Sequence, residues 1–241
     1  RRAESPGLVD DKTTTQWWQY VAEYLTDAAM ACALKSSDSL RAWIRNVTVG
    51  LVRRPRTDWV GPWYRNRGEQ EIGHLETAHL AWGVAVALDL VPDVFTDSEK
   101  EEIRACLRDR AIPMCRRWLA AHDHLANWRC VMNAGVAVPA AVLGDAEALD
   151  AAAEEFSLNT QAFQPDGSYA ESLQYGNYAG YACMLTCEAL LRSGRYDSAD
   201  GIGPERYAGY ARWAAHSLFY CKSLAGWGQN PRPRSANFND C

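Results

Sequence analysis

The stretch LANWRCVMNAGVAVPAAVLGD, residues 125–145, decides the fold. A polar Asn-Trp pair opens it, and its later turns are small and apolar. The apolar residues recur at three- and four-residue intervals, which is the period of an α-helix. Gly144 stands where such a helix should stop. The stretch therefore predicts a helix over residues 127–143.

Seven further segments have the same helical period, and no β-alternation competes with them. They span residues 15–34, 37–54, 73–90, 97–121, 146–163, 172–191 and 204–225. Thr96 with Glu99 predicts a capping box, Gly194 predicts a helix end, and Pro204 suits a first turn. Pro113 and Pro139 lie inside predicted helices, where they should kink or interrupt them.

The eight segments pair through short linkers into about four antiparallel helical hairpins. A longer polar loop, residues 55–72, separates the second helix from the third. Self-similarity between the hairpins is too faint for a named repeat. We therefore expect one all-α domain over residues 1–241, either a curved open stack or an incomplete α/α toroid. In a toroid, the loops at one rim of the inner helices form a natural cleft.

Composition limits the partners. The 241 residues are 48% hydrophobic and 23% charged, as in ordinary globular proteins, and no apolar run is long enough to cross a bilayer. A net charge of -5 argues against nucleic acid as a partner. Neither a membrane nor a nucleic acid is therefore expected, and the oligomeric state is left open.

The eight cysteines do not resemble a disulfide scaffold, because most fall inside helix-like segments and should be buried thiols. Cys183 and Cys187 are one helical turn apart, yet no His or second Cys pair stands at metal-ligand spacing. No metal and no cofactor are therefore expected. The cysteines within the predicted helices are Cys106, Cys115, Cys130, Cys183, Cys187 and Cys221.

Positive charge gathers in RRPRTDWVGPWYRNR, residues 53–67, which holds five arginines against one Asp. Arginine offers a fork that matches carboxylate or sulfate, and flat aromatic rings stack on sugars. Trp63, Tyr64, Arg65 and Arg67 are therefore candidate substrate-binding residues. The alternative is a solvated surface loop with two buried tryptophans.

Phenols gather in PDGSYAESLQYGNYAGY, residues 165–181, where a loop turns into a helix. Tyr175, Tyr178 and Tyr181 recur at helical spacing, so they could serve as packing anchors on one face. The alternative is that one of them is aimed at a substrate. Asp166 and Gly167 predict a tight turn just before them.

The two motif segments together resemble the heparinase II/III-like polysaccharide lyases and their alginate-lyase relatives. In these proteins an Asn-Trp or Asn-His opens a toroid helix, and DG-x-Y-x-E-x-x-x-Y-x-x-Y follows about fifty residues later. Here Asn127 and Tyr175 are forty-eight residues apart. GHLETAHLAWGVAVALDLV, residues 73–91, is similar to the helix that precedes the site in these proteins.

The resemblance implies β-elimination on a polysaccharide or oligosaccharide that contains uronic acid. A donor must hold the uronate carboxylate while a base removes the C5 proton. Asn127 is the implied donor and Tyr175 the implied acid and base, with Tyr178 as second choice. Trp128, Arg129 and Glu171 would contact substrate or position these groups.

The chain departs from the family in two respects. Many relatives have a His where this chain has Trp128, so charge neutralisation would depend on Asn127, Arg129 or one of His122 and His124. Relatives also carry a β-sheet domain after the toroid, so we expect this chain to be the N-terminal part of a longer lyase. The resemblance implies a secreted or periplasmic protein.

Other interpretations stay open. A glycoside hydrolase of the same architecture would need two carboxylates in one cleft, for which Glu171 and Glu76 are the best pair. A non-catalytic helical module would bind saccharide without turnover. Asn127 could be only a helix N-cap, and Glu171 only a carboxylate near a helix start. The histidines within predicted helices, His74, His79 and His216, are expected to be structural.

Overall fold

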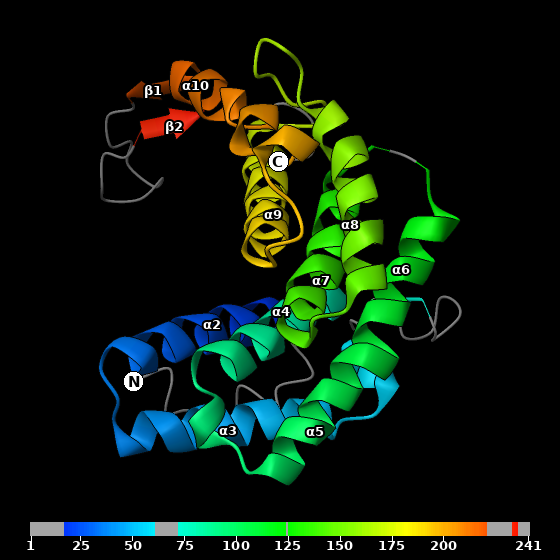
Figure 1. Ribbon diagram of the computed structural model, residues 1–241. Helices are drawn as coiled ribbons and strands as arrows, with labels where there is room; N and C mark the ends of the chain where they lie inside the picture. The colour runs from blue at the N-terminus through cyan, green and yellow to red at the C-terminus, as the bar shows by residue number, and fades with distance from the viewer. Residues whose placement is uncertain (1–16, 61–71, 124, 221–232, 236–241) are drawn as a thin grey trace.

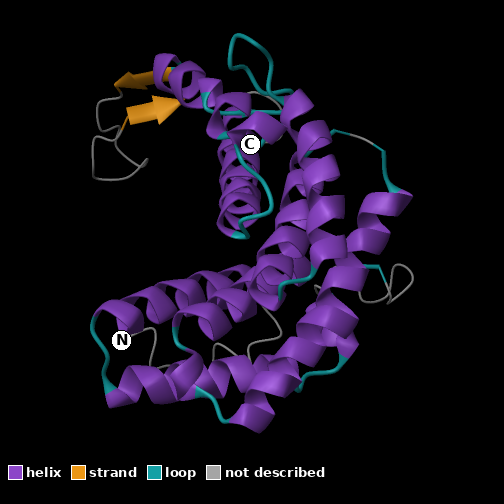
Figure 2. Ribbon diagram, viewed as in Figure 1, coloured by secondary structure: helices purple, strands orange, loops and turns teal. Residues whose placement is uncertain are grey.

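The computed structural model describes residues 17–60, 72–123, 125–220 and 233–235. Within these ranges the protein is all-α, apart from a short antiparallel pair, β1 (Leu218–Tyr220) and β2 (Pro233–Ser235). The prediction of an almost entirely helical chain is therefore confirmed (Figure 2). The α-helices are α2 (Trp17–Leu34), α3 (Asp38–Val52), α4 (Leu75–Leu90), α5 (Asp97–Cys106), α6 (Ile112–Ala121), α7 (Asn127–Leu143), α8 (Ala146–Asn159), α9 (Leu173–Arg192) and α10 (Gly209–His216).

The helix ends follow the local sequence. Thr96 Oγ1 accepts from the Glu99 N–H at 3.2 Å, and Glu99 accepts in turn from the Thr96 N–H at 2.9 Å, so the predicted capping box is confirmed. Gly144 and Gly194 follow α7 and α9 with φ of 68° and 71°. This left-handed conformation is costly for other residues, which explains why each helix stops at a glycine.

Helices α2, α4, α7 and α9 pack on one another in series. The starts of α4 and α7 meet where the His74 and Trp128 rings lie 5.9 Å apart, and the start of α7 meets Glu171, just before α9. The last turns of α4, α7 and α9 also lie together, at the opposite end of these helices, around Val86 and Leu185. Helices α4, α7 and α9 therefore run in the same sense, with all three starts together. Figure 1 labels these helices and their neighbours.

Helix α7 lies at the centre of the described fold, in contact with α4, α6, α8 and α9. Thirteen of its 17 residues are buried, most of them Ala, Val or Gly. It packs tightly on α4, where a Cβ placed on Gly135 would lie 2.7 Å from the Ala78 Cα. Small side chains let the two backbones approach this closely.

The remaining helices cover this series from outside. Helix α3 contacts α2 and α5, α6 contacts α7, and α8 contacts both α7 and α9. Arg45 of α3 binds Glu99 of α5 through Nε and Nη2, the latter at 2.7 Å from Oε1. Each outer helix thus connects neighbours along the series.

The two prolines inside predicted helices have different outcomes. The predicted helix over 97–121 is continuous but contains a π-helical turn, η3 (Leu107–Ala111), before Pro113. The Ile112 N–H bonds to the Leu107 carbonyl, five residues back, and the wider turn accommodates the chain ahead of a proline that has no N–H. Pro139 lies within α7 without ending it.

The predicted helix over 204–225 is wrong in extent. The chain forms a 3₁₀ turn, η6 (Pro204–Arg206), then the short α10, and then β1. The residues of β1 are Leu-Phe-Tyr, and aromatic residues favour strands over helices. Residues 221–225 lie outside the described residues.

The thiols are internal. Cys32, Cys106, Cys115, Cys130, Cys183 and Cys187 are free and buried, which confirms the expectation for every helical cysteine except Cys221, which lies outside the described residues. Burial raises the pKa of the Cys106 thiol to about 11, so it stays protonated at neutral pH.

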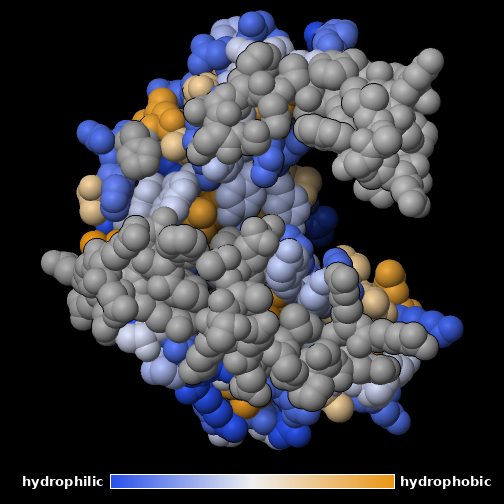
Figure 3. All heavy atoms as spheres, turned by 180° about the vertical axis from the view of Figure 1, so that it is seen from behind, coloured by the Kyte–Doolittle hydropathy of each residue, from blue (hydrophilic) through white to orange (hydrophobic). Residues whose placement is uncertain are grey.

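No helix in the described ranges combines the length and apolarity needed to cross a membrane. Figure 3 shows the side opposite to Figure 1, where the coloured surface is largely hydrophilic and hydrophobic residues form separate patches.

Candidate functional site

The Asn-Trp segment and the DG-x-Y-x-E segment meet at the common start of α4, α7 and α9, called here the rim (residues 72–79, 125–129 and 169–178). The backbone N–H of Asn127 donates to Glu171 Oε2 at 2.7 Å. Asn127 Nδ2 lies 2.9 Å from Oε1 and 3.0 Å from Oε2 of the same carboxylate. Tyr169 donates its hydroxyl to Glu171 Oε2 at 2.8 Å.

Glu171 therefore occupies the start of α7 rather than the start of its own helix. Ala126 is the N-cap of α7 and gives no side-chain hydrogen bond, and Asn127 is the first helical residue. The interpretation of Asn127 as an N-cap is wrong, because a carboxylate from another segment satisfies the exposed N–H instead. Ser172 is the cap of α9, accepting from the Tyr175 N–H at 3.2 Å.

The side chain of Asn127 is almost completely buried, with 3% of the residue exposed. Among the described residues its Oδ1 has no hydrogen-bond partner. A buried amide oxygen without a partner costs free energy. Such buried polar atoms are rare in native structures.

Tyr178 and His79 form a second polar contact at the rim. The Tyr178 hydroxyl lies 2.6 Å from His79 Nε2, and the two rings are stacked with centroids 5.6 Å apart. His79 also packs on Trp82 at 4.0 Å between ring centroids. Burial raises the pKa of Tyr178 well above its usual value, and nearby Glu76 raises it further. Burial lowers the pKa of His79 well below its usual value, so both groups are neutral at pH 7.

This buried histidine predicts a pH-dependent stability. Below about pH 6.5 the unfolded chain takes up a proton on His79 that the folded chain does not, so folding loses free energy as the pH falls. The loss from His79 is at most about 1.4 kcal/mol per pH unit. His79→Gln should therefore flatten the decrease in unfolding free energy between pH 6.5 and 4.5, measured by urea denaturation.

The matched control is His216→Gln, at an exposed position on α10. Because His79 is intact in this variant, the decrease in unfolding free energy that His79 causes should remain. His74 will retain part of the slope in both variants, since burial and the nearby His122 lower its pKa to about 4. If the unfolding free energies of the wild type and His79→Gln decrease with pH at the same rate, His79 has the same pKa in the folded and the unfolded chain. That result would contradict the prediction.

Tyr175 is placed differently from Tyr178. It is half-buried in the first turn of α9, where its ring packs against the edge of the hydrophobic core. Tyr181 is farther along the helix and is 43% exposed. Of the three tyrosines that recur at helical spacing, Tyr178 is hydrogen-bonded to His79. Tyr175 lies nearest to the start of the helix.

The guanidinium of Arg129 is bound within the fold. Its guanidinium forms a two-pronged ion pair with Glu155 of α8, including Nη2 to Oε2 at 2.9 Å, and it also donates to the His122 carbonyl. Only 8% of the residue is exposed. This contact makes Arg129 a structural link between α7, α8 and the loop before α7, and these contacts occupy the guanidinium that was expected to bind a substrate.

Trp128 belongs to an aromatic group beneath the rim. Its ring lies at 5.7 Å from Trp118 with nearly parallel planes, and Trp118 in turn stacks on His122 at 4.3 Å. Trp128 is half-buried and meets His74 edge-on. A histidine at position 128, as in many members of the lyase family, would leave much of this contact area unfilled.

The predicted binding residues Trp63, Tyr64, Arg65 and Arg67, with His124, lie outside the described residues. Two other arginines of the arginine-rich segment 53–67 pair with carboxylates. Arg53 binds Glu102 at 2.8 Å, and Arg54 binds Asp58 at 3.0 Å. Trp59 is buried, as the alternative interpretation of this loop expected for its tryptophans.

Sequence reasoning missed two participants at the rim. Tyr169 was seen only as part of the DG-x-Y motif, although its hydroxyl binds Glu171. His79 was expected to be structural, and its contact with Tyr178 joins residues 99 positions apart. Glu76 is buried at the start of α4, and its charge acts on Tyr178.

The described residues contain no group of three or more His, Cys, Asp or Glu side chains able to hold a metal ion. Comparison with models of known protein families gave no match, and comparison with curated proteins gave no significant relative.

Proposed function

We propose that this chain is the α/α-toroid part of a polysaccharide lyase that cleaves uronic-acid-containing chains by β-elimination. The observation that carries the proposal is the contact between Asn127 and Glu171 at the start of α7. It joins the Asn-Trp segment to the DG-x-Y-x-E segment, the two motifs whose order and spacing resemble the heparinase II/III-like lyases.

The helix arrangement supports the same proposal. Helices α2, α4, α7 and α9 would be the inner helices of the toroid, and α3, α5 with α6, and α8 the outer ones, giving antiparallel hairpins. The inner starts would then form one wall of the substrate cleft. The arginine-rich loop, with Trp63, Tyr64, Arg65 and Arg67, would supply stacking and anion-binding groups for the polymer.

Asn127 is proposed to hold the uronate carboxylate. The two N–H groups of an amide diverge, so one carboxylate at this distance engages one of them well. Contact of Nδ2 with both oxygens of Glu171 therefore leaves the second N–H for a substrate carboxylate. Glu171 fixes the amide, and Tyr169 fixes Glu171.

Tyr175 is proposed to remove the C5 proton and return it to the leaving 4-oxygen. Tyr178 suits this role less well, because its hydroxyl already bonds to His79 and its pKa is raised. A base whose charged form is strongly disfavoured is a poor proton acceptor near neutral pH. We therefore assign Tyr178 to positioning within the rim.

The test is digestion of a panel of polyuronates, including glycosaminoglycans and alginate, with the full-length protein. Elimination creates a conjugated double bond, so absorbance in the ultraviolet should rise with time. Release of saturated reducing ends without absorbance would indicate hydrolysis, with Glu171 and Glu76 as the carboxylate pair. Saccharide binding without either product would indicate a binding module, and both results would refute the lyase proposal.

A further inference from the structure

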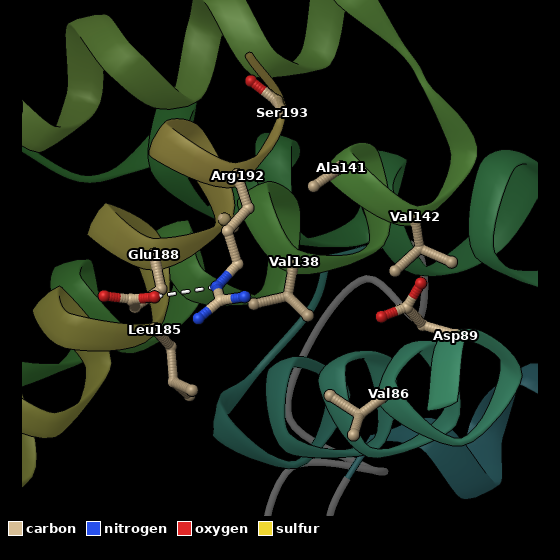
Figure 4. A pocket seen from close by; sticks show the side chains of 10 residues that line it. Val86, Asp89, Val138, Ala141, Val142, Leu185, Glu188, Arg192 and Ser193 are labelled. Atoms are coloured by element: carbon tan, nitrogen blue, oxygen red, sulfur yellow. Dashed lines mark hydrogen bonds and ion pairs between the residues drawn. The ribbon is translucent and has the colours of Figure 1, made fainter. Parts of the chain in front are cut away.

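A pocket lies at the end of the fold opposite the rim. It encloses about 260 Å³ between the last turns of α4, α7 and α9. Its apolar wall is made of Val86, Val138, Ala141, Val142, Leu185 and Ala189. Figure 4 shows these side chains converging from the three helices. A volume of this size suits a small molecule with a hydrophobic body.

The charged residues around the pocket are mainly acidic. Asp89 and Glu188 contribute two carboxylates, and Arg192 contributes one guanidinium. Arg192 Nε binds Glu188 at 2.8 Å, so this cation is already paired. Asp89 is exposed on α4, its carboxylate is turned toward Val142 and Val138 in Figure 4, and it forms no ion pair with any described residue.

The ends of the three helices also favour a cation in the pocket. Helices α4, α7 and α9 all end beside the pocket, at Leu90, Leu143 and Arg192. The last carbonyls of a helix lack intrahelical partners and carry partial negative charge, which favours a cation. Neither α4 nor α7 has a basic residue in its last turn to balance that charge.

We propose that this pocket binds a small hydrophobic cation, such as an alkylammonium or arylammonium. The hydrocarbon part would replace water against the valines and Leu185, and the ammonium would lie between Asp89 and the helix ends. An anionic sugar would meet the carboxylate of Asp89 and the negative ends of α4 and α7, so this site is separate from the rim. The inference does not depend on the proposed lyase activity.

The experiment is titration of the full chain with benzyltrimethylammonium, followed by calorimetry or by NMR shifts of Val and Leu methyl groups. The matched neutral probe is neopentylbenzene, in which a quaternary carbon replaces the nitrogen, dispersed at its solubility limit, and the matched anion is phenylacetate. We expect binding of the cation, at least fivefold weaker binding of the neutral probe and no binding of the anion. Shifts should be confined to the pocket methyl groups.

Asp89→Asn should weaken cation binding about fivefold, which is the upper range for one partly exposed charge pair. Raising the salt concentration should reduce the affinity of the wild type more than that of the variant. The control is Glu154→Gln, an exposed carboxylate on α8 outside the pocket, which should bind as the wild type does. Circular dichroism should show that both variants keep the wild-type melting temperature.

A second variant, Ala141→Phe, tests the apolar wall independently, because a phenyl group would fill the space that the ligand needs. It should abolish binding. Equal affinity for the cation and the neutral probe, an unchanged affinity in Asp89→Asn, or no binding by the wild type would each overturn the proposal.

Discussion

Replacing Tyr175 by phenylalanine is expected to lower turnover of a polyuronate by a factor of about a hundred or more. The change keeps the ring and its packing against the core but removes the hydroxyl that would take the C5 proton. General acid and base assistance is typically worth about 10²–10⁴ in rate. The measurement is the initial rate of ultraviolet absorbance with the full-length protein, at saturating substrate.

Two matched variants on the same helix separate chemistry from packing. Tyr181→Phe changes an exposed phenol and should keep the wild-type rate. Tyr178→Phe removes the hydrogen bond to His79 and should reduce stability by about 1 kcal/mol, with a smaller effect on turnover than Tyr175→Phe. Wild-type turnover in both Tyr175→Phe and Tyr178→Phe would mean that the phenols of this segment serve packing.

Replacing Gly135 by alanine is expected to destabilise the fold by about 2 kcal/mol. The added Cβ would lie 2.7 Å from both the Cα and Cβ of Ala78 and 2.9 Å from Cys115 Sγ. Because one of these atoms belongs to the backbone of α4, rotation of a side chain cannot relieve the overlap, and α4 and α7 must separate. Overpacking of this kind costs about 1–3 kcal/mol or more, which exceeds the gain of up to about 1 kcal/mol from replacing glycine in a helix.

Thermal unfolding measures this effect, and a decrease in Tm of several degrees is expected for a chain of this size. The control is Gly180→Ala on α9, where the nearest atom to an added Cβ is Tyr210 Cδ1 at 4.0 Å. Only the helix propensity changes there, so this variant should be stabilised by about 0.5–1 kcal/mol. A Gly135→Ala protein as stable as Gly180→Ala would contradict the close packing of α4 on α7.

The helices could be predicted because their signals are local. The period of apolar residues, the Thr96 capping box and the glycines after α7 and α9 depend only on neighbours within a few positions. The error at residues 204–225 has the same origin. Apolar period alone cannot distinguish a helix from a helix followed by a strand when aromatic residues continue the pattern.

The candidate site was only partly predictable, because its contacts join distant segments. Motif spacing indicated that Asn127 and the segment after Asp166 belong together, but not that Glu171 would bind the amide. Arg129 was expected to face a substrate because arginine suits carboxylates. Its actual carboxylate is Glu155, 26 positions away on another helix, and no sequence pattern marks that pairing.

The central position of α7 has a consequence for local unfolding. Each short side chain buries little apolar area. Helix α7 is therefore stabilised by contacts with the four helices around it rather than by an amphipathic face of its own. Its backbone amides should exchange with deuterium only when the whole domain opens. Those of α10, which buries only Tyr210, should exchange through smaller and more frequent openings.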